Sequence, residues 1–231
     1  MSKLLASIKE AIEKCELRDG MTISFHHHMR NGDYVLNMVL DEIAKMGIKD
    51  LTVNASSVFD VHEPIIGHIK NGVVTGIECN YMGGKVGKAI SEGIMDKPVI
   101  FRSHGGRASD MEKGTSVIDV AFIAAPTADD MGNCTGKVGK SACGSIGYAF
   151  ADAMNAKKVV VITDNLVEYP LVDFSIPEVY VDYVVAVDQI GNPAGIVSGT
   201  TKITRDPVGL KMASYAAKAV SYTHLRAHET E

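Results

Sequence analysis

Residues 22–33 read Thr22-Ile23-Ser24-Phe25-His26-His27-His28-Met29-Arg30-Asn31-Gly32-Asp33, and this stretch decides the fold. Thr22 to Phe25 is β-prone and follows the turn signal Asp19-Gly20, which predicts a strand. Asn31-Gly32-Asp33 then supplies a loop and an N-cap for an amphipathic helix over Tyr34 to Met46. Open α/β sheets have this order of strand, polar loop and helix, and they bind ligands at the carboxyl ends of their strands. We therefore expect the histidine triplet to lie at the edge of an active site.

The same alternation continues in both directions along the chain. Apolar residues at helical spacing predict helices, and short β-prone or continuously apolar runs predict strands. Further helices are expected at Leu4–Cys15, Glu63–Asn71, Tyr148–Asn155 and Pro207–Ala219, and another helix follows Gly87 and ends at Glu92. Further strands are expected at Leu51–Val53, Val73–Cys79, Val99–Phe101, Val117–Ala125, Val159–Thr163 and Tyr180–Val187. This order predicts an α/β fold, a mainly parallel sheet with helices on both faces.

Composition excludes several classes of partner. The chain has 231 residues, 46% of them hydrophobic, and a net charge of -5 with basic and acidic residues intermixed, which favours neither nucleic acid nor an anionic membrane. No apolar run approaches the roughly 20 residues of a membrane span. The four cysteines form no Cys-x-x-Cys pair, and the amino terminus lacks the apolar core of a signal peptide. We expect a reduced, cytoplasmic protein with no nucleic-acid or membrane partner.

The histidine triplet invites a metal site, but strand geometry argues against one. Alternation along a strand sends His26 and His28 to one side and His27 to the other, which leaves at most two convergent ligands. We therefore expect no metal. Two interpretations remain: the histidines cap a strand end, or they donate hydrogen bonds to a substrate. An imidazole beside Arg30 suits an anionic substrate.

The string Arg102-Ser103-His104-Gly105-Gly106-Arg107 directly follows a predicted strand, and we expect it to form a loop. A guanidinium presents a rigid fork of donors that matches a carboxylate, so Arg102 and Arg107 in one loop suit a polycarboxylate. The alternative is that both are surface arginines on a mobile loop.

Two glycine-rich stretches have no nucleotide-binding signature. One contains Gly83 and Gly84, and the other is the long loop from Pro126 to Gly144, which continues into Ser145 and Gly147. Neither matches a Walker loop or a dinucleotide fingerprint. Such loops present backbone N–H groups to an oxyanion or to a phosphopantetheine-like arm. Cys143 is either a nucleophile or, more simply, a small buried cysteine.

These strings together resemble one family, the citrate lyase alpha subunit. The run from Asp19 to Asp33 is similar to the opening of that family, and the later strings Cys79–Gly84, Phe101–Arg107 and Asp130–Gly136 agree in order. The resemblance covers essentially Lys3 to Val220. It implies a CoA-transferase-like α/β domain that forms the first half of a longer alpha subunit.

The resemblance also implies an activity, citrate CoA-transferase of the acyl-carrier type. Acetyl carrier protein and citrate give citryl carrier protein and acetate, and a beta subunit then cleaves the citryl thioester to oxaloacetate. The expected partners are the beta subunit and the gamma subunit, which is the acyl carrier protein. No cofactor is expected on this chain, because the CoA-like phosphopantetheine group is carried by the gamma subunit.

Chemical inference assigns roles to residues within the resembling strings. We expect His26, His28 and Arg30 to act at the reacting carboxyl or thioester oxygen, and Arg102, His104 and Arg107 to bind citrate. The residues expected to contact the carrier arm are Gly83, Gly84, Gly136, Lys137, Gly144 and Ser145.

The domain organisation follows from the same resemblance. Residues 1–220 are expected to form one CoA-transferase-like domain that holds half a site and is inactive alone, because related transferases build the site between two halves. Residues 221–231 have no apolar face and are expected to be a non-native tail. A citramalate lyase alpha subunit, or another acyl-CoA transferase, is the alternative among enzymes. A sugar-phosphate-sensing domain is the alternative that is not an enzyme.

Overall fold

The computed structural model describes residues 2–196 and 204–227. They belong to two compact units, Met1–Val197 and Ser198–Glu231, and each unit is described by itself. The first unit contains every residue for which a site role is predicted.

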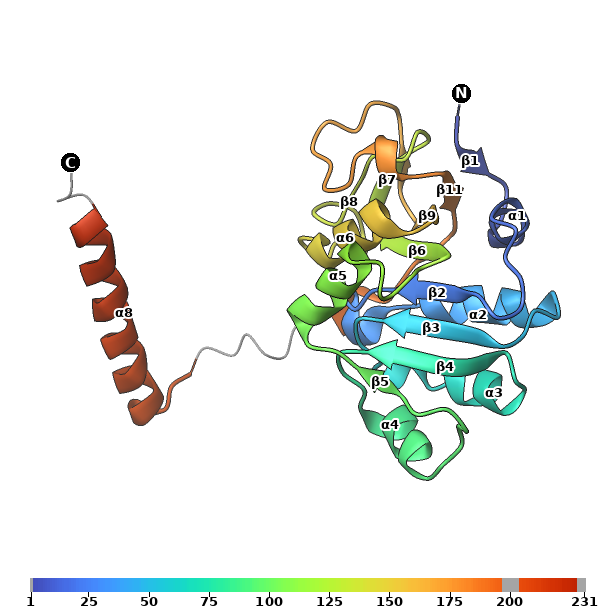
Figure 1. Ribbon diagram of the computed structural model, residues 1–231. Helices are drawn as coiled ribbons and strands as arrows, with labels where there is room; N and C mark the ends of the chain where they lie inside the picture. The colour runs from blue at the N-terminus through green and yellow to red at the C-terminus, as the bar shows by residue number, and fades with distance from the viewer. Residues whose placement is uncertain (1, 197–203, 228–231) are drawn as a thin grey trace. The chain divides into compact units, whose positions relative to one another are not determined.

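Within the described residues, the first unit has one eight-stranded sheet in the order β1-β11-β9-β6-β2-β3-β4-β5 (Figure 1). All seven neighbouring pairs are parallel. The strands are β1 Leu4–Leu5, β2 Thr22–Phe25, β3 Leu51–Ala55, β4 Val74–Cys79, β5 Ile100–Phe101, β6 Val120–Ala125, β9 Lys158–Thr163 and β11 Tyr183–Ala186. The predicted parallel sheet is confirmed. Strand β2, which leads into the histidine triplet, lies between β6 and β3.

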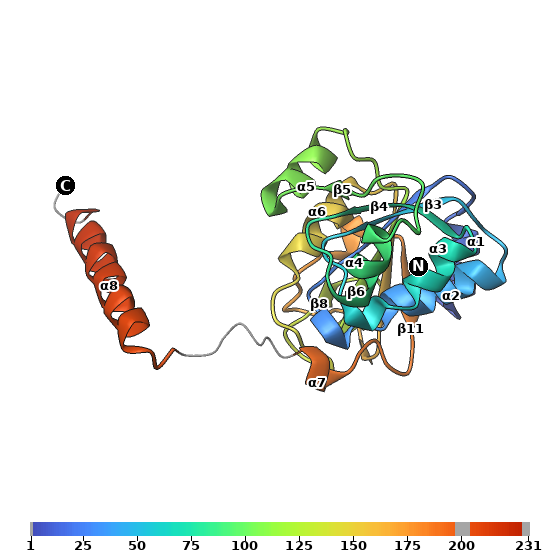
Figure 2. The same ribbon diagram turned by 90° about the horizontal axis from the view of Figure 1, so that it is seen from below.

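Helices pack on both faces of this sheet, as predicted (Figure 2). The core on one face includes residues of α1 Ile8–Lys14, α2 Val35–Lys45, α3 Ile65–Lys70 and α4 Gly84–Ser91. The core on the other face includes residues of α5 His104–Glu112 and α6 Gly147–Asn155. Short 3-10 helices η1 Arg30–Gly32, η2 Asp60–His62 and η3 Glu178–Tyr180, and the short helix α7 Pro193–Ile196, lie in the connections.

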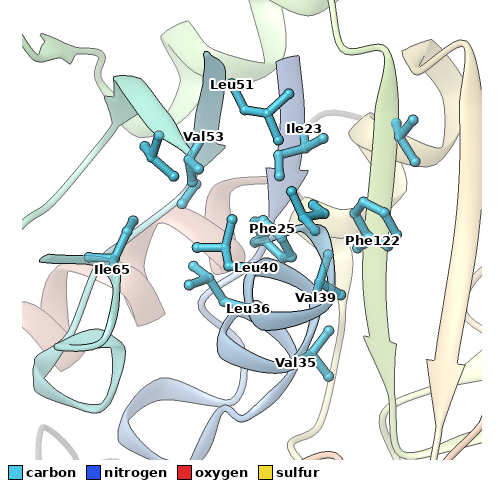
Figure 3. Packing of buried hydrophobic residues seen from close by; sticks show 14 of the residues in the cluster. Ile23, Phe25, Val35, Leu36, Val39, Leu40, Leu51, Val53, Ile65 and Phe122 are labelled. Atoms are coloured by element: carbon cyan, nitrogen blue, oxygen red, sulfur yellow. The ribbon is translucent and has the colours of Figure 1, made fainter. Parts of the chain in front are cut away.

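The alternation of side chains along β6 shows why this strand is apolar throughout. Phe122 and Ala124 belong to the core beneath α1 to α4, whereas Ala121 and Ile123 belong to the core beneath α5 and α6. A strand covered on both faces has no polar side. Figure 3 shows the first of these cores, in which residues of α2 such as Leu36 face the central strands.

The amino-terminal helix starts later than predicted. Leu4 and Leu5 form β1 and pair with β11, so they are not the first turn of a helix. The helix begins at Ile8 because the Ser7 hydroxyl accepts a hydrogen bond from the Glu10 N–H at 3.1 Å, an N-cap that the apolar pattern does not reveal. Gly47 has a φ of +78° and follows the end of α2, in the left-handed conformation that glycine commonly adopts there.

The predicted long loop from Pro126 to Gly144 contains two strands. β7 Thr127–Asp129 and β8 Cys134–Thr135 are antiparallel, and β10 Leu166–Val167 joins β7 to complete a small second sheet. The turn between β7 and β8 is closed by Asp129, whose carboxylate accepts the backbone N–H groups of Met131, Gly132 and Asn133 at 2.8 to 3.1 Å. These bonds close the turn around Gly132.

The second unit contains α8 Pro207–Ala227. It starts where Asp206-Pro207 predicts, because the Asp206 carboxylate accepts the Gly209 N–H at 2.7 Å. The helix continues beyond Ala219, the predicted end. The predicted non-native tail, 221–231, overlaps α8 up to Ala227, and residues 228–231 lie outside the described part of the chain. Its non-native origin stays a prediction. No helix in the described ranges is long and apolar enough to cross a membrane.

Candidate functional site

Polar residues follow the carboxyl ends of four adjacent strands. His26 to His28 follow β2, Ser56 follows β3, Asn80 follows β4, and Arg102 follows β5. Because these strands are parallel, the four segments meet at one edge of the sheet. The edge is tied together by backbone bonds, since Asn80 N–H donates to the Ser56 carbonyl at 3.2 Å.

The predicted Arg102–Arg107 loop is wrong in its second half. The Ser103 hydroxyl accepts the Gly106 N–H at 3.0 Å and caps α5, which begins at His104. Arg107 therefore sits on the first turns of a helix, facing inward. The amide of Asn80 donates to the carbonyls of Arg102 and Ser103 at 2.8 Å each and fixes the entry to this helix.

Arg107 is fully enclosed, with 1% of its surface exposed. Its Nη1 and Nη2 donate to the two carboxylate oxygens of Asp152 on α6, at 2.7 Å each. Its Nε donates to Asn54 Oδ1 on β3 at 2.7 Å. This guanidinium is occupied by internal acceptors, so the geometry does not support the predicted contact between Arg107 and citrate.

His26 belongs to the same buried group. Its Nε2 lies 3.1 Å from Asp152 Oδ2, and 1% of its side chain is exposed. Burial raises the pKa of Asp152, but the charges of His26 and Arg107 outweigh it and hold that pKa well below its ordinary value. Asp152 is thus a carboxylate at neutral pH that pairs with Arg107 and lies beside His26, whose ring nitrogens are both buried.

Arg102 is also paired within the protein. Its Nη1 donates to Glu78 at 2.6 Å and its Nε to Asp110 at 2.8 Å, and 14% of its side chain is exposed. Glu78 in turn accepts from Asn54 Nδ2 at 2.9 Å, which links this pair to Arg107. The arginines of the string therefore belong to one continuous polar network and not to a mobile surface loop.

The accessible part of the site is formed by three rings from different elements. The ring centroid of His27 lies 5.8 Å from that of His104 on α5 and 5.7 Å from that of Tyr148 on α6, and the latter two are 5.3 Å apart. His104 is exposed and the other two are half-buried. The sequence predicts a role for His104 but misses His27 and Tyr148.

The expected alternation of the triplet holds only in part. His26 and His28 do lie together, with ring centroids 5.9 Å apart. His27, however, faces α5 and α6, the same helices that surround His26. Strand β2 ends at Phe25, so strict alternation does not extend through the histidines.

His27 and His28 are both uncharged at neutral pH. Burial, followed by the neighbouring charge of His104, lowers the pKa of His27 to about 4. Burial, followed by His26, lowers the pKa of His28 to about 4. His28 Nε2 donates to the Ala124 carbonyl at 2.7 Å, which leaves Nδ1 unprotonated, buried and without a partner in the described part of the chain.

Arg30 differs from the other two arginines because no carboxylate within the described ranges pairs with it. It lies near enough to His27 for its charge to lower the pKa of that ring. Its φ is +52°, a left-handed conformation that is strained for a residue with a side chain. Its guanidinium is therefore the best placed, of the three predicted arginines, to receive an external carboxylate.

A second buried pair, Asp33 and His62, lies close in sequence to Arg30 at its Asp33 end. Asp33 Oδ1 accepts the Val35 N–H at 3.0 Å. The predicted N-cap is nevertheless wrong by one residue, because α2 begins at Val35 and its N-cap is Tyr34. Asp33 Oδ2 lies 3.0 Å from His62 Nε2, and His62 Nδ1 accepts the Phe59 N–H at 3.1 Å. His62 therefore carries its proton on Nε2 and donates it to Asp33. The sequence does not reveal this partner, 29 residues away.

The glycines predicted to contact a carrier arm are explained by internal contacts. Gly84 has a φ of +60°, and a side chain there would collide with Asp60, whose carboxylate accepts the Lys85 N–H at 3.2 Å. Gly136 accepts the N–H groups of Cys143 and Gly144 at 2.9 and 3.0 Å. A carrier-arm role for these glycines, and for Gly83 and Ser145, stays a prediction.

Two further side chains of these stretches have defined surroundings. Lys137 pairs with Asp173 at 2.7 Å on the surface. Burial raises the pKa of Cys143 to about 11, so its thiol is protonated at neutral pH. This favours the small buried cysteine over the nucleophile.

Sequence reasoning misses Asn54 and Asp152, which carry most of the buried network. A signal is present for both, because each is a polar residue inside an otherwise apolar element. Asn54 interrupts the buried strand β3, and Asp152 lies between Ala149 and Ala153 on the buried face of α6. A buried polar residue requires a partner, but the sequence does not say which one.

Comparison with known proteins gives a consistent result. A family model described as citrate lyase, alpha subunit, matches residues 1–225. The citrate lyase alpha chain of Haemophilus influenzae is 47% identical over 218 residues, which are 94% of this chain and 44% of that protein. This chain therefore spans less than half the length of that curated relative.

Solved structures agree with the family match. A Streptococcus mutans protein, described as an alpha subunit of citrate lyase and crystallised in complex with citrate, is 59% identical with a TM-score of 0.89, and the match covers 96% of this chain and 43% of that one. Glutaconate CoA-transferase from Acidaminococcus fermentans is 17% identical with a TM-score of 0.57, over 84% and 77% of the two chains. The latter likeness shows the fold alone, and it confirms the predicted CoA-transferase-like fold.

The buried pair gives a first test. Arg107→Met leaves the Asp152 carboxylate buried without its bidentate partner, so we expect the free energy of unfolding to fall by about 3–5 kcal/mol. As a matched control, Lys137→Met removes an exposed pair and is expected to cost about 0–1 kcal/mol. Urea unfolding followed by circular dichroism measures both. Equal losses for the two variants would show that the Arg107 pair does not hold the fold.

Protonation of the histidines gives a second test. His27 and His28 have a pKa near 4 in the folded chain and an ordinary value of 6.5, so between these values the unfolded chain binds more protons. The free energy of unfolding should therefore decrease as the pH falls from 7 towards 4. Urea midpoints at pH 7, 6 and 5 should decline less steeply for His28→Gln than for the unchanged chain. The same slope in both proteins would contradict the burial of a neutral His28.

Proposed function

Because the chain belongs to the citrate lyase alpha-subunit family, we propose that its protein transfers a carrier thioester from acetate to citrate. Acetyl carrier protein and citrate give citryl carrier protein and acetate. The 59% identical Streptococcus mutans relative, crystallised with citrate, supports citrate as the acid. A citramalate or other acyl-CoA transferase remains the alternative, and it would differ in the acid accepted.

The transfer needs no nucleophile from the protein. A carboxylate oxygen of citrate attacks the acetyl carbonyl and the C–S bond breaks. The products of this step are a mixed anhydride of citrate and acetate and the thiolate of the carrier. The thiolate then attacks the citryl carbonyl of that anhydride, which forms the new thioester and releases acetate. Such chemistry requires donors that position the acid and stabilise oxyanions. The imidazoles and the guanidinium at the strand ends are groups of this kind.

The observation that carries the proposal is the guanidinium of Arg30, which pairs with no carboxylate among the described residues and lies near a neutral His27. In this proposal Arg30 receives a citrate carboxylate and His104 contacts the same ligand. His26, Arg102 and Arg107 have a different role from the one the sequence predicts. These three side chains pair with carboxylates of the protein, and through these pairs they hold the strand ends and α5 in position.

The wider setting is part of the same proposal. The chain works in the cytoplasm with a beta subunit and with a gamma subunit that carries the phosphopantetheine arm. Residues 1–220 supply one CoA-transferase-like half, and the site is completed by a second half. The 231-residue chain alone is therefore inactive, and acetate release by it would contradict this arrangement.

The test is acetate release from acetylated carrier protein on addition of citrate. The assay uses the full-length subunit, expressed from the complete gene that encodes this chain. Arg30→Gln removes a charge-assisted contact of about 1.5–3 kcal/mol, so kcat/KM should fall by about 10- to 150-fold. Arg18→Gln, at the opposite end of β2, is the matched control and should match the unchanged protein. Turnover that survives in Arg30→Gln would exclude Arg30 from the carboxylate site, and turnover with citramalate alone would replace citrate as the substrate.

A further inference from the structure

The hydroxyl of Ser56 bonds twice to the same residue, His27. We propose that Ser56 is a positioning residue that holds His27 as the Nε2–H tautomer, so that His27 donates a hydrogen bond to an oxygen of the bound acid or thioester. The donor role rests on the proposed transfer function. The tautomer does not, because it follows from contacts within the chain.

Ser56 is itself fixed at the end of β3. It is completely buried, its N–H donates to the Phe25 carbonyl at 3.3 Å, and its carbonyl accepts the Asn80 N–H at 3.2 Å. Its Oγ lies 2.9 Å from the backbone nitrogen of His27 and 2.6 Å from the ring Nδ1. The backbone N–H of His27 can only donate, so Ser56 Oγ accepts there.

Counting protons then selects the tautomer. Ser56 Oγ has one proton, and within the described ranges its acceptor is His27 Nδ1. If Nδ1 carried the ring proton instead, it would donate to Oγ, and the Ser56 proton would be buried without an acceptor. A buried unpaired donor is unfavourable. The arrangement that satisfies every group places the His27 proton on Nε2.

The surroundings of His27 keep this donor neutral. The ring faces His104 and Tyr148. Burial, and after it the charges of His104, His26, Arg30 and Arg107, oppose its protonation. A neutral Nε2–H donates to a carboxylate or a developing oxyanion without giving up its proton. It therefore suits a reaction in which the acid must stay ionised to attack.

Nitrogen NMR of the ¹⁵N-histidine-labelled chain tests the tautomer directly. At pH 7 we expect His27 Nε2 to show the shift of a protonated nitrogen and Nδ1 that of an unprotonated acceptor. Ser56→Ala should move both shifts towards the average of two tautomers, and Ser56→Thr, which keeps the hydroxyl, should restore them. A proton on Nδ1 in the unchanged chain, or identical spectra for Ser56→Ala, would overturn the proposal.

Two substitutions of His27 in the full-length subunit test the donor. His27→Gln places an amide N–H near the position of Nε2, whereas His27→Asn places one nearer Nδ1. Citrate-dependent acetate release should lose less than about 10-fold in kcat/KM for His27→Gln and about 10²- to 10³-fold for His27→Asn. Equal losses would overturn the donor role.

The two measurements separate the possible failures. Without citrate turnover in the unchanged subunit, the transfer function and the donor role both fail, while the tautomer is still decided by NMR. With turnover but the other tautomer, the transfer function stands and the proposal for Ser56 fails.

Discussion

The bidentate ion pair between Arg107 and Asp152 is the interaction on which the site depends. It joins α5 to α6 beneath the carboxyl ends of β2 and β3, through the contacts of the same two residues with His26 and Asn54. Two rings of the site, His104 and Tyr148, come from these two helices. A buried pair of this kind is expensive to desolvate and very sensitive to loss of one partner. The pair is therefore better explained by the position it gives to α5 and α6 than by a net gain in the free energy of unfolding.

The charges of the site fall into two groups. Those of Arg102, Arg107 and Asp152 are matched within the protein and form a continuous frame. Arg30 is held in a left-handed backbone conformation with no carboxylate beside it in the described residues, and His27 is kept neutral next to it. This division places an available cation and a neutral donor at one edge, backed by groups that cannot rearrange without breaking buried bonds.

Local patterns predicted most of the fold and little of the frame. The strand-helix alternation and the strand-end position of the triplet follow from spacing alone, and both are confirmed. Arg107 was predicted to bind citrate because a guanidinium matches a carboxylate. The sequence could not show its internal partners, since Asn54 and Asp152 are 53 and 45 residues away and no local signal connects them. The turn at Asp129 depends on side-chain bonds to the backbone, so glycine content alone predicted a loop there. The family was identified from whole sequence motifs, such as the histidine triplet with its flanking residues. These motifs did not assign a role to each residue.

Citrate titration of the chain, followed by the side-chain NMR signals of its arginines and of His27, tests the central claim most directly. The account predicts that Arg30 Nε and His27 Nε2 shift together along one binding curve, while Arg107 Nε stays unchanged because it is enclosed by Asp152 and Asn54. Acetate at equal ionic strength is the control for non-specific anion effects. Shifts confined to Arg102 and Arg107, with Arg30 and His27 unaffected at saturating citrate, would contradict the account.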